Sequence, residues 1–502
     1  MRIRALLAAV LLVALAPVAA RAASDDQKQF AQSVVERNTQ AINDMSDSLY
    51  YFGELGFQEF DSTKLVRDTM RAAGFTVELG GAGMPTNFWA KWGSGKPYIV
   101  IETEVDALPG GSQTPDVFTH KPLVDGAPGH MEGHNTHSGV STAAAFAVKQ
   151  TLEKYHLPGT IAVHFGPAEE ELGSRPFVVR AGYFKDVDAV IYLHIGDNFT
   201  TGAGLQDYAA ISTRFTFHGK TAHGAIDPWD GKNALDAAEL MDSGLAFLRE
   251  QLLPSARVHR AIMNGGLQPN IIPDLTQVWY FVRDRTMQLA KQTQDKLVNI
   301  AKGAALMTGT TVDITYDASA WPQLSNKTLA LMVQKNIDAV GMPVWTPTEQ
   351  TYARGLQKAL NVKEIGLYTK PTTFGERAQV AASNDSGDVS WVVPAVVYTF
   401  PASVPGIQYH NWQAGVTPVS SIAHKGEVAG AKVLADTILD LMTSPDTLAA
   451  ARTEWLQETK DGGYFSLLPP DAKPQIDMNK ATMAKYRPAM SKYYVHKTPR
   501  YH

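Results

Sequence analysis

The chain of 502 residues contains no cysteine. Disulfide bonds, thiolate metal sites and cysteine nucleophiles are therefore excluded, and a metal site would have to be built from histidine, aspartate and glutamate. Basic residues are not in excess either, because 45 lysines and arginines stand against 50 acidic residues. The chain thus lacks the basic face that a nucleic-acid-binding protein needs, and we expect no nucleic-acid partner.

Long apolar runs are also scarce, and the one that occurs lies near the start of the chain. Arg2 and Arg4 precede it, residues 5–18 are apolar with one proline, and Ala-Arg-Ala at 20–22 fits a small-x-small cleavage site. A membrane anchor is the alternative, but it needs about 20 apolar residues and this run is shorter. We therefore expect residues 1–23 to be a cleaved signal peptide, and the mature protein to be periplasmic or secreted and free of the membrane.

Two common catalytic motifs are missing as well, namely a Walker phosphate-binding loop and a Gly-x-Ser-x-Gly nucleophile elbow. The chain is otherwise ordinary, with 44% hydrophobic and 19% charged residues. This composition is typical of a soluble globular enzyme with a sizeable core. The length predicts two domains, or one large domain with an insertion.

What the sequence does contain is a histidine-rich loop at 129–137, reading Gly-His-Met-Glu-Gly-His-Asn-Thr-His. Glu132 and His134 stand two residues apart with a glycine between them, and an alanine-rich helical run follows. Carboxylate and imidazole on a tight loop can converge on one ion, and both suit zinc or manganese. The alternative is a polar surface turn in which Asn135 or Ser138 caps the helix.

Polar groups also follow three predicted buried strands. These groups are Glu104 and Asp106 after residues 98–104, Glu169, Glu170 and Glu171 after 159–165, and His194 at the end of 188–193. Open α/β sheets place their active sites at the carboxyl ends of such strands. Strand-end caps, a solvated acidic turn and a structural histidine are the alternative interpretations.

The order of predicted elements gives an α/β fold interrupted by a different arrangement. Residues 209–320 alternate as strand-helix-strand-strand-helix-strand, which is typical of a small two-layer α+β domain. The predicted parts are a first catalytic segment at 24–208, the inserted domain at 209–320, a second catalytic segment at 321–443, and a C-terminal tail packed on the surface at 444–502. At the start, residues 27–51 are predicted to form one amphipathic helix.

Seven motifs in this order resemble the dinuclear-metal aminoacylase and carboxypeptidase superfamily, in particular the branch of aminobenzoyl-glutamate hydrolase (its B-type chain) and auxin-conjugate amidohydrolases. They are Glu-Val-Asp-Ala-Leu-Pro (104–109), Gly-His-x-x-Gly-His-Asn (129–135), Pro-Ala-Glu-Glu (167–170), Gly-Lys-Thr-Ala-His-Gly (219–224), Asn-Gly-Gly-x-x-Pro-Asn-Ile-Ile-Pro (264–273), Ser-Gly-Asp-Val-Ser-Trp (386–391) and the loop of His410. The resemblance implies a zinc-exopeptidase-like catalytic domain with a mixed central sheet, and a βαββαβ insertion that serves as lid and dimerisation domain.

The resemblance also implies roles for individual residues. Two divalent ions per chain, zinc or manganese, would be bound by Glu132, His134, Glu170, His194 and His410. Glu169 matches the catalytic glutamate, and Asp106 would orient a ligand histidine. His223 matches a lid histidine that reaches the active site of the partner subunit in relatives, while Asn270 and Arg283 match lid positions near the substrate.

The implied activity is hydrolysis of the amide bond of a small N-acyl amino acid, an aminobenzoyl-glutamate-like conjugate or a dipeptide. The implied assembly is a homodimer, or a complex with a related subunit. The branch usually has cysteine where this chain has Glu132, and a carboxylate is a harder ligand that can bridge two ions. A metal-containing binding protein without turnover is the alternative function. For Arg283, the alternative role is a pairing with Asp284 or another acid of the inserted domain.

Overall fold

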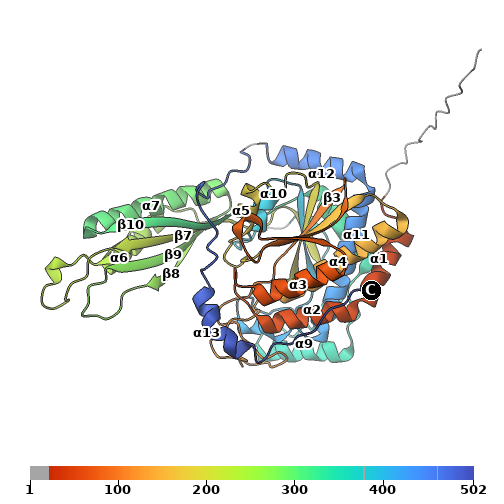
Figure 1. The fold of residues 1–502 in the computed structure, drawn as a ribbon, viewed down its shortest axis with the longest axis horizontal. Coiled ribbons are helices and arrows are strands. Elements are labelled where there is room, and N and C mark those ends of the chain that lie inside the picture. Colours follow the sequence, from red (N-terminus) through yellow and green to blue (C-terminus); the bar gives the residue numbers. More distant parts are fainter. Residues whose placement is uncertain (1–21, 377–378, 461) are drawn as a thin grey trace, which may run out of the picture.

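The structure is a computed structural model, which describes residues 22–376, 379–460 and 462–502. The described strands form two sheets, one of nine strands and one of four. In Figure 1 the small sheet and its two helices project from one side of the larger body. The large sheet is mixed, which confirms the predicted α/β class with a mixed central sheet.

Four parallel strands form the centre of the large sheet: β4 (Gly159–Phe165), β3 (Tyr98–Thr103), β5 (Ala189–Gly196) and β13 (Ala395–Pro401). The flanking strands are β1 (Thr76–Leu79) and β2 (Phe88–Ser94) on one side, and β11 (Leu324–Ser325), β6 (Thr200–Leu205) and β12 (Gly375–Glu376) on the other. Because the central strands are parallel, their carboxyl ends meet at one edge, where chemistry is expected in such sheets.

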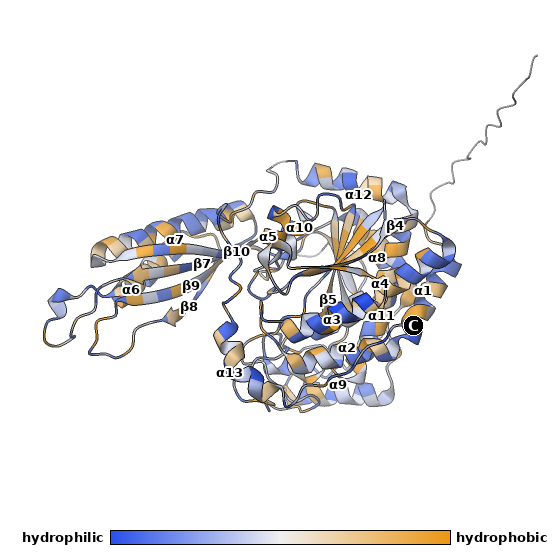
Figure 2. Ribbon diagram, viewed as in Figure 1, coloured by the Kyte–Doolittle hydropathy of each residue, from blue (hydrophilic) through white to orange (hydrophobic). Residues whose placement is uncertain are grey.

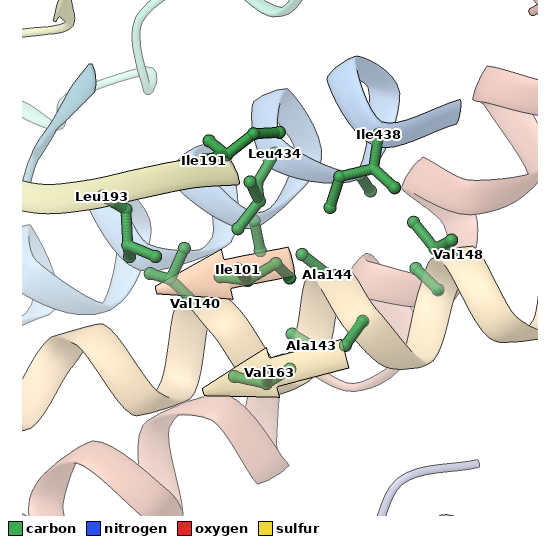
Figure 3. Packing of buried hydrophobic residues seen from close by; sticks show 14 of the residues in the cluster. Ile101, Val140, Ala143, Ala144, Val148, Val163, Ile191, Leu193, Leu434 and Ile438 are labelled. Atoms are coloured by element: carbon green, nitrogen blue, oxygen red, sulfur yellow. The ribbon is translucent and has the colours of Figure 1, made fainter. Parts of the chain in front are cut away.

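Helices cover one face of the large sheet with apolar side chains. The main ones are α4 (Asn135–Tyr155) and α11 (Ser421–Thr443), with α1 (Asp25–Arg37), α2 (Thr39–Phe52), α3 (Phe60–Ala72) and α8 (Lys327–Val340) around them. Helix α9 (Pro347–Ala359) packs in a separate apolar cluster. Figure 3 shows Ile101 and Val163 of the strands against Ala143 and Ala144 of α4. These small alanines let α4 approach the sheet closely. The central strands, against which the helices pack, are apolar in Figure 2.

The opposite face of the large sheet carries a second apolar cluster. Val100 points to it, while its neighbours Ile99 and Ile101 point to the first face, as strand periodicity requires. The covering helices here are short: α5 (Arg175–Arg180) and α10 (Ser386–Ser390). Both sides of the central strands are therefore buried, which explains their continuous apolar sequence.

The small sheet has the order β10-β7-β9-β8 and is antiparallel throughout. Its elements follow the chain as β7 (Ala209–His218), α6 (Ala234–Leu248), β8 (Arg257–Asn264), β9 (Leu275–Asp284), α7 (Met287–Thr308) and β10 (Thr311–Ala320). Both helices pack on one face through a separate apolar cluster. On the other face, Phe281 packs against a small cluster that includes Leu172 of the larger body, and His259 and Arg283 line a cavity together with residues of that body.

The C-terminal segment contains two helices, α12 (Pro445–Glu458) and α13 (Lys480–Met490), and returns to the N-terminal helices. The N–H of His502 donates to Asn38 Oδ1 at 2.7 Å, and Asn38 Nδ2 donates to the carbonyl of His502 at 3.0 Å. The prediction of one helix over 27–51 is wrong, because α1 ends at Arg37 and α2 begins at Thr39, with Asn38 between them. The Asn38 side chain also bonds to Val34 O, and so holds this break.

The predicted signal peptide lies outside the described residues, except for its last two. Ala23 is buried, and its N–H donates to Asp440 at 3.0 Å. Within the described ranges, no helix combines the length and apolar character needed to cross a membrane. Cleavage and export stay predictions.

Candidate active site

Acidic and imidazole side chains gather at the carboxyl edge of the four parallel strands. Glu104 and Asp106 follow β3, Glu169 and Glu170 follow β4, His194 lies in β5, and His410 lies in the loop after β13. Strands β4, β3, β5 and β13 are neighbours in the sheet, so these segments converge. The side chains that the sequence placed at strand ends therefore lie together in one region of the fold.

The histidine-rich loop is buried beside this edge. His134 and Asn135 are at most 1% exposed, so a polar surface turn is excluded. Helix α4 begins at Asn135, without a side-chain cap, and the Asn135 amide instead donates to Ser46 O and Pro418 O. Gly133 has φ +90°, and a Cβ there would lie 2.6 Å from Ile195. Only glycine lets the loop turn so closely against β5.

The ligand-type atoms of the site lie close to one another. Glu132 Oε2 is 2.6 Å from His410 Nε2, and Glu132 Oε1 is 3.5 Å from His194 Nε2. His410 Nε2 is also 3.4 Å from Glu170 Oε2. Among the described residues, four overlapping groups of possible metal ligands have their ligand atoms within 4.8 Å of one another. Three of them contain Glu132 or Glu170, namely Glu132–His134–His194, Glu132–Glu170–His410 and His134–Glu169–Glu170, and the fourth is the fully buried group Glu104–His134–His137.

Two buried polar atoms in these groups fit a bound cation. His134 Nε2 and Glu170 Oε1 have no hydrogen-bond partner among the described residues. Buried polar atoms are normally paired, and an unpaired one costs about 1–3 kcal/mol. Asp106 Oδ1 lies 3.3 Å from His134 Nδ1, which directs Nε2 of that ring into the group. The oxygen and nitrogen donors thus fit divalent metal ions.

The charges of the site lead to the same conclusion. Burial raises the pKa of Glu169 and of Glu170 well above the usual range, and neighbouring carboxylates raise it further. Burial alone would lower the pKa of His134, but the hydrogen bond to Asp106 and the nearby carboxylates raise it to about 10. The carboxyl groups of Glu169 and Glu170 therefore favour the protonated form when no cation is present, and a bound cation would favour their charged form.

A cavity of about 520 Å³ opens on this group. Glu132, Glu169 and His410 line one side, and His259 and Arg283 of the small sheet line another. Arg283 forms no hydrogen bond or ion pair with any residue that the structure describes, and its Nε is buried. Among the described residues no ion pair joins Arg283 to Asp284, whose carboxylate accepts the backbone N–H of Arg285. The lining of the cavity therefore combines carboxylates with a guanidinium that has no hydrogen-bond or ion-pair partner among the described residues.

Two predicted residues lie elsewhere. His223 is exposed in a loop of the small domain, where its Nδ1 accepts the N–H groups of Ala225 and Ile226. Asn270 is next to it, with its carbonyl accepting the N–H of Gly224 at 2.9 Å, and is also exposed. Neither residue lines the cavity of its own chain. Of the three lid residues named from sequence, the structure brings only Arg283 to the cavity.

A buried ion network beneath the site was not predicted. Its centre is Arg175, whose side chain is fully buried and donates to Glu102 at 3.0 Å, Glu104 at 2.7 Å and Asp385 at 2.8 Å. Glu104 in turn contacts His137 Nδ1 at 2.9 Å. The local sequence around Arg175 resembles any helix start, and nothing in it indicates burial. The acids that follow β3 were the one sequence signal that pointed to this region.

Comparison with known proteins shows which family and which relatives this chain resembles. Residues 100–395 match the model of Peptidase family M20/M25/M40. The chain is 33% identical over 473 residues to the B chain of p-aminobenzoyl-glutamate hydrolase of Escherichia coli (strain K12), covering 89% of this chain and 98% of that one. It is 29% identical over 442 residues to Xaa-Arg dipeptidase of Mus musculus, covering 85% and 92%.

Among solved structures, the aminobenzoyl-glutamate utilization protein of Klebsiella pneumoniae superposes with a TM-score of 0.58 at 17% identity. The match covers 81% of this chain and 97% of that one. At this identity the likeness concerns the fold, and it agrees with the mixed large sheet described above.

The Arg175 network leads to a stability prediction. Replacing Arg175 with methionine leaves three buried carboxylates without their cation, and we expect a loss of about 3–5 kcal/mol in the free energy of unfolding. Arg260→Met is the control, because the Arg260–Asp242 pair is 34% and 40% exposed and should contribute no more than about 1 kcal/mol. Urea unfolding measures both, and similar small losses would show that Arg175 is not the required counter-charge.

Proposed function

This chain belongs to peptidase family M20/M25/M40, and we propose that it hydrolyses the amide bond of a small N-acyl amino acid, an aminobenzoyl-glutamate-like conjugate or a dipeptide with two divalent metal ions. Membership makes it a metal-dependent hydrolase of amide or peptide bonds. The single observation that carries the proposal is the convergence of carboxylates and imidazoles, two of them with unpaired buried atoms, on a cavity that also holds an unpaired guanidinium.

Five side chains are proposed as ligands of the two ions, which are zinc or manganese: Glu132, His134, Glu170, His194 and His410. Glu132 is central among them, because its two oxygens approach different histidines, Oε1 toward His194 and Oε2 toward His410. A carboxylate with this placement suits a bridging role between two ions. In this proposal Glu132 would replace the thiolate that is usual in this branch and would keep both metal positions.

When bound, the ions would supply Lewis-acid activation of the amide carbonyl and of water. Glu169 is the proposed proton carrier, which accepts a proton from water and delivers it to the leaving nitrogen. Its side chain lines the cavity, and its Oε2 lies 3.9 Å from His134 Nε2. Burial raises the pKa of Glu169, which suits a group that must hold a proton during the reaction.

Arg283 is the proposed binding group for the free carboxylate of the substrate. Its planar guanidinium matches a carboxylate in two parallel hydrogen bonds, and it lines the same cavity as Glu169 and Glu170. Burial lowers the pKa of Arg283, whereas the nearby acids Glu169, Asp207 and Glu170 favour its charged form. A substrate carboxylate would give this charge a partner that the described part of the chain does not provide.

His223 and Asn270 are proposed to act in a second copy of the chain, or in a related subunit. Both are exposed together at the small domain and away from the cavity of their own chain. The Escherichia coli relative is named as one of two chains of a hydrolase, which supports an assembly of more than one chain. In that assembly His223 would stabilise the oxyanion formed at the carbonyl, an effect of about 3 kcal/mol for comparable donors.

The first prediction of this proposal concerns Glu169. Glu169→Gln should keep its metal and lose most of its turnover, by at least about 100-fold, because the proton carrier alone is removed. Glu170→Gln is the matched comparison and should lose metal as well as turnover. Elemental analysis and hydrolysis of N-acyl amino acids with zinc and with manganese measure both properties. If turnover of Glu169→Gln falls less than about tenfold, Glu169 is not the base.

A second prediction concerns the substrate carboxylate. Each hydrolysed conjugate is compared with its carboxamide, which cannot form the charged pair with Arg283. We expect the carboxamide to react at least about tenfold more slowly in kcat/KM, and Arg283→Met to remove this difference. Arg285→Met is the control, since Arg285 is exposed and bonds to Tyr208. Equal rates for acid and amide with the unchanged enzyme would refute carboxylate recognition.

A third prediction concerns the assembly. His223→Ala and Glu169→Gln should each be inactive alone, whereas mixed dimers would contain one complete site made from both chains. Mixing the two variants should therefore restore activity, up to about a quarter of the unchanged level if subunits exchange at random. The absence of any recovery, with exchange proven by tagged chains, would place His223 in the site of its own chain.

A further inference from the structure

Glu171 is the third acid of the run that follows β4, and the proposed reaction does not use it. Its side chain is 7% exposed and is not among the residues that line the cavity. Its Oε1 accepts a hydrogen bond of 2.6 Å from Asn479 Nδ2. The carboxylate also packs on Gly56, where a Cβ would lie 2.1 Å from Oε2. The Glu171 side chain thus contacts other parts of the protein and does not line the cavity.

The turn that carries Glu169 and Glu170 is tight and strained. The N–H of Leu172 donates to Glu169 O at 2.7 Å, and the N–H of Gly173 donates to Ala168 O at 2.8 Å. Ala168 and Leu172 have φ of 56° and 58°, which side-chain-bearing residues adopt rarely. Such residues each cost about 1–3 kcal/mol and persist only where surrounding contacts fix them.

Three side chains from outside the turn provide those contacts. Glu59 accepts the N–H of Ala168 at 2.9 Å, and Asp106 accepts the N–H of Glu170 at 2.9 Å. The third is Asn479, the one residue of the three that comes from the C-terminal segment 444–502. The start of the turn, its middle and its end are therefore each held by a different segment of the chain.

Asn479 is itself firmly placed. Its Nδ2 also donates to Gly56 O at 3.0 Å, and it immediately precedes α13. Helix α13 packs through Met483 and Met490 on Leu55 and Ala127. Its Arg487 donates to the carbonyl of Gln58 at 2.9 Å and contacts the carboxylates of Glu54 and Asp61. The helix therefore holds Asn479 against the segment that underlies the turn.

We propose that Asn479 is a positioning residue for catalysis, which fixes the turn of Glu169 and Glu170 through its hydrogen bond to Glu171. The C-terminal segment is then a working part of the active site and not merely a surface covering. The inference rests on the proposed function, because Glu169 and Glu170 are the groups that it places. A displacement of about 1 Å at such groups can lower a rate 100-fold.

The test is a double-mutant cycle with Asn479→Ala, Glu171→Ala and the double variant, each saturated with metal. Lys480→Ala is the matched control, since the Lys480 ammonium pairs with the exposed Asp477 and not with the turn. We expect each single variant to lower kcat at least about tenfold with KM changed less than about twofold. The double variant should be no worse than either single one, because both remove the same bond. Glu171→Gln, which still accepts from Asn479, should keep most of kcat.

A second measurement does not need turnover. Hydrogen exchange of the amides in residues 166–173 should be faster in Asn479→Ala and in Glu171→Ala, and unchanged in Lys480→Ala. If the unchanged protein hydrolyses no amide, the proposed function fails while this measurement still tests the contact. Unchanged exchange, or a kcat within about twofold of the unchanged protein in both single variants, would overturn the positioning role.

Discussion

The arrangement of the site depends on one buried cation, the guanidinium of Arg175. It pairs with two acids at the end of β3, Glu102 and Glu104, and with Asp385 from a loop that also forms the cavity wall. Without a cation these carboxylates could not remain charged in the interior. Arg175 therefore fixes the end of the central strand relative to the wall of the cavity, and the groups that face the substrate are built on that frame.

Histidines connect this frame to the cavity. Glu104 contacts His137 Nδ1, and His137 Nε2 accepts the N–H of Ile195, which holds α4 against β5 beside His194. One step nearer the cavity, Asp106 contacts both the ring of His134 and the N–H of Glu170. The two histidines thus differ in their hydrogen bonds. Both ring nitrogens of His137 are paired, which suits a structural role, whereas Nε2 of His134 has no partner among the described residues and is left for a ligand.

The sequence predicted the parts of this site that follow from strand ends and local motifs. Glu104, Asp106, Glu169 and His194 could be placed together, because the carboxyl ends of parallel strands meet at one edge. Contacts between distant segments could not be predicted. The sequence around Arg175 is that of an ordinary helix start and does not indicate its acidic partners. Asn479 lies 308 residues from Glu171, so the local sequence does not indicate that contact either. The break between α1 and α2 at Asn38 could not be predicted for the same reason, because Asn38 bonds to the distant residue His502.

The proposed hydrolysis requires that Glu132, His134, Glu170, His194 and His410 together bind two metal ions. Crystals grown with zinc and with manganese, measured at the absorption edge of each metal, test it most directly. We expect two anomalous peaks per chain within about 2.0–2.3 Å of these side chains, with Glu132 contacting both. A single peak, or peaks at which Glu132 takes no part, would contradict it.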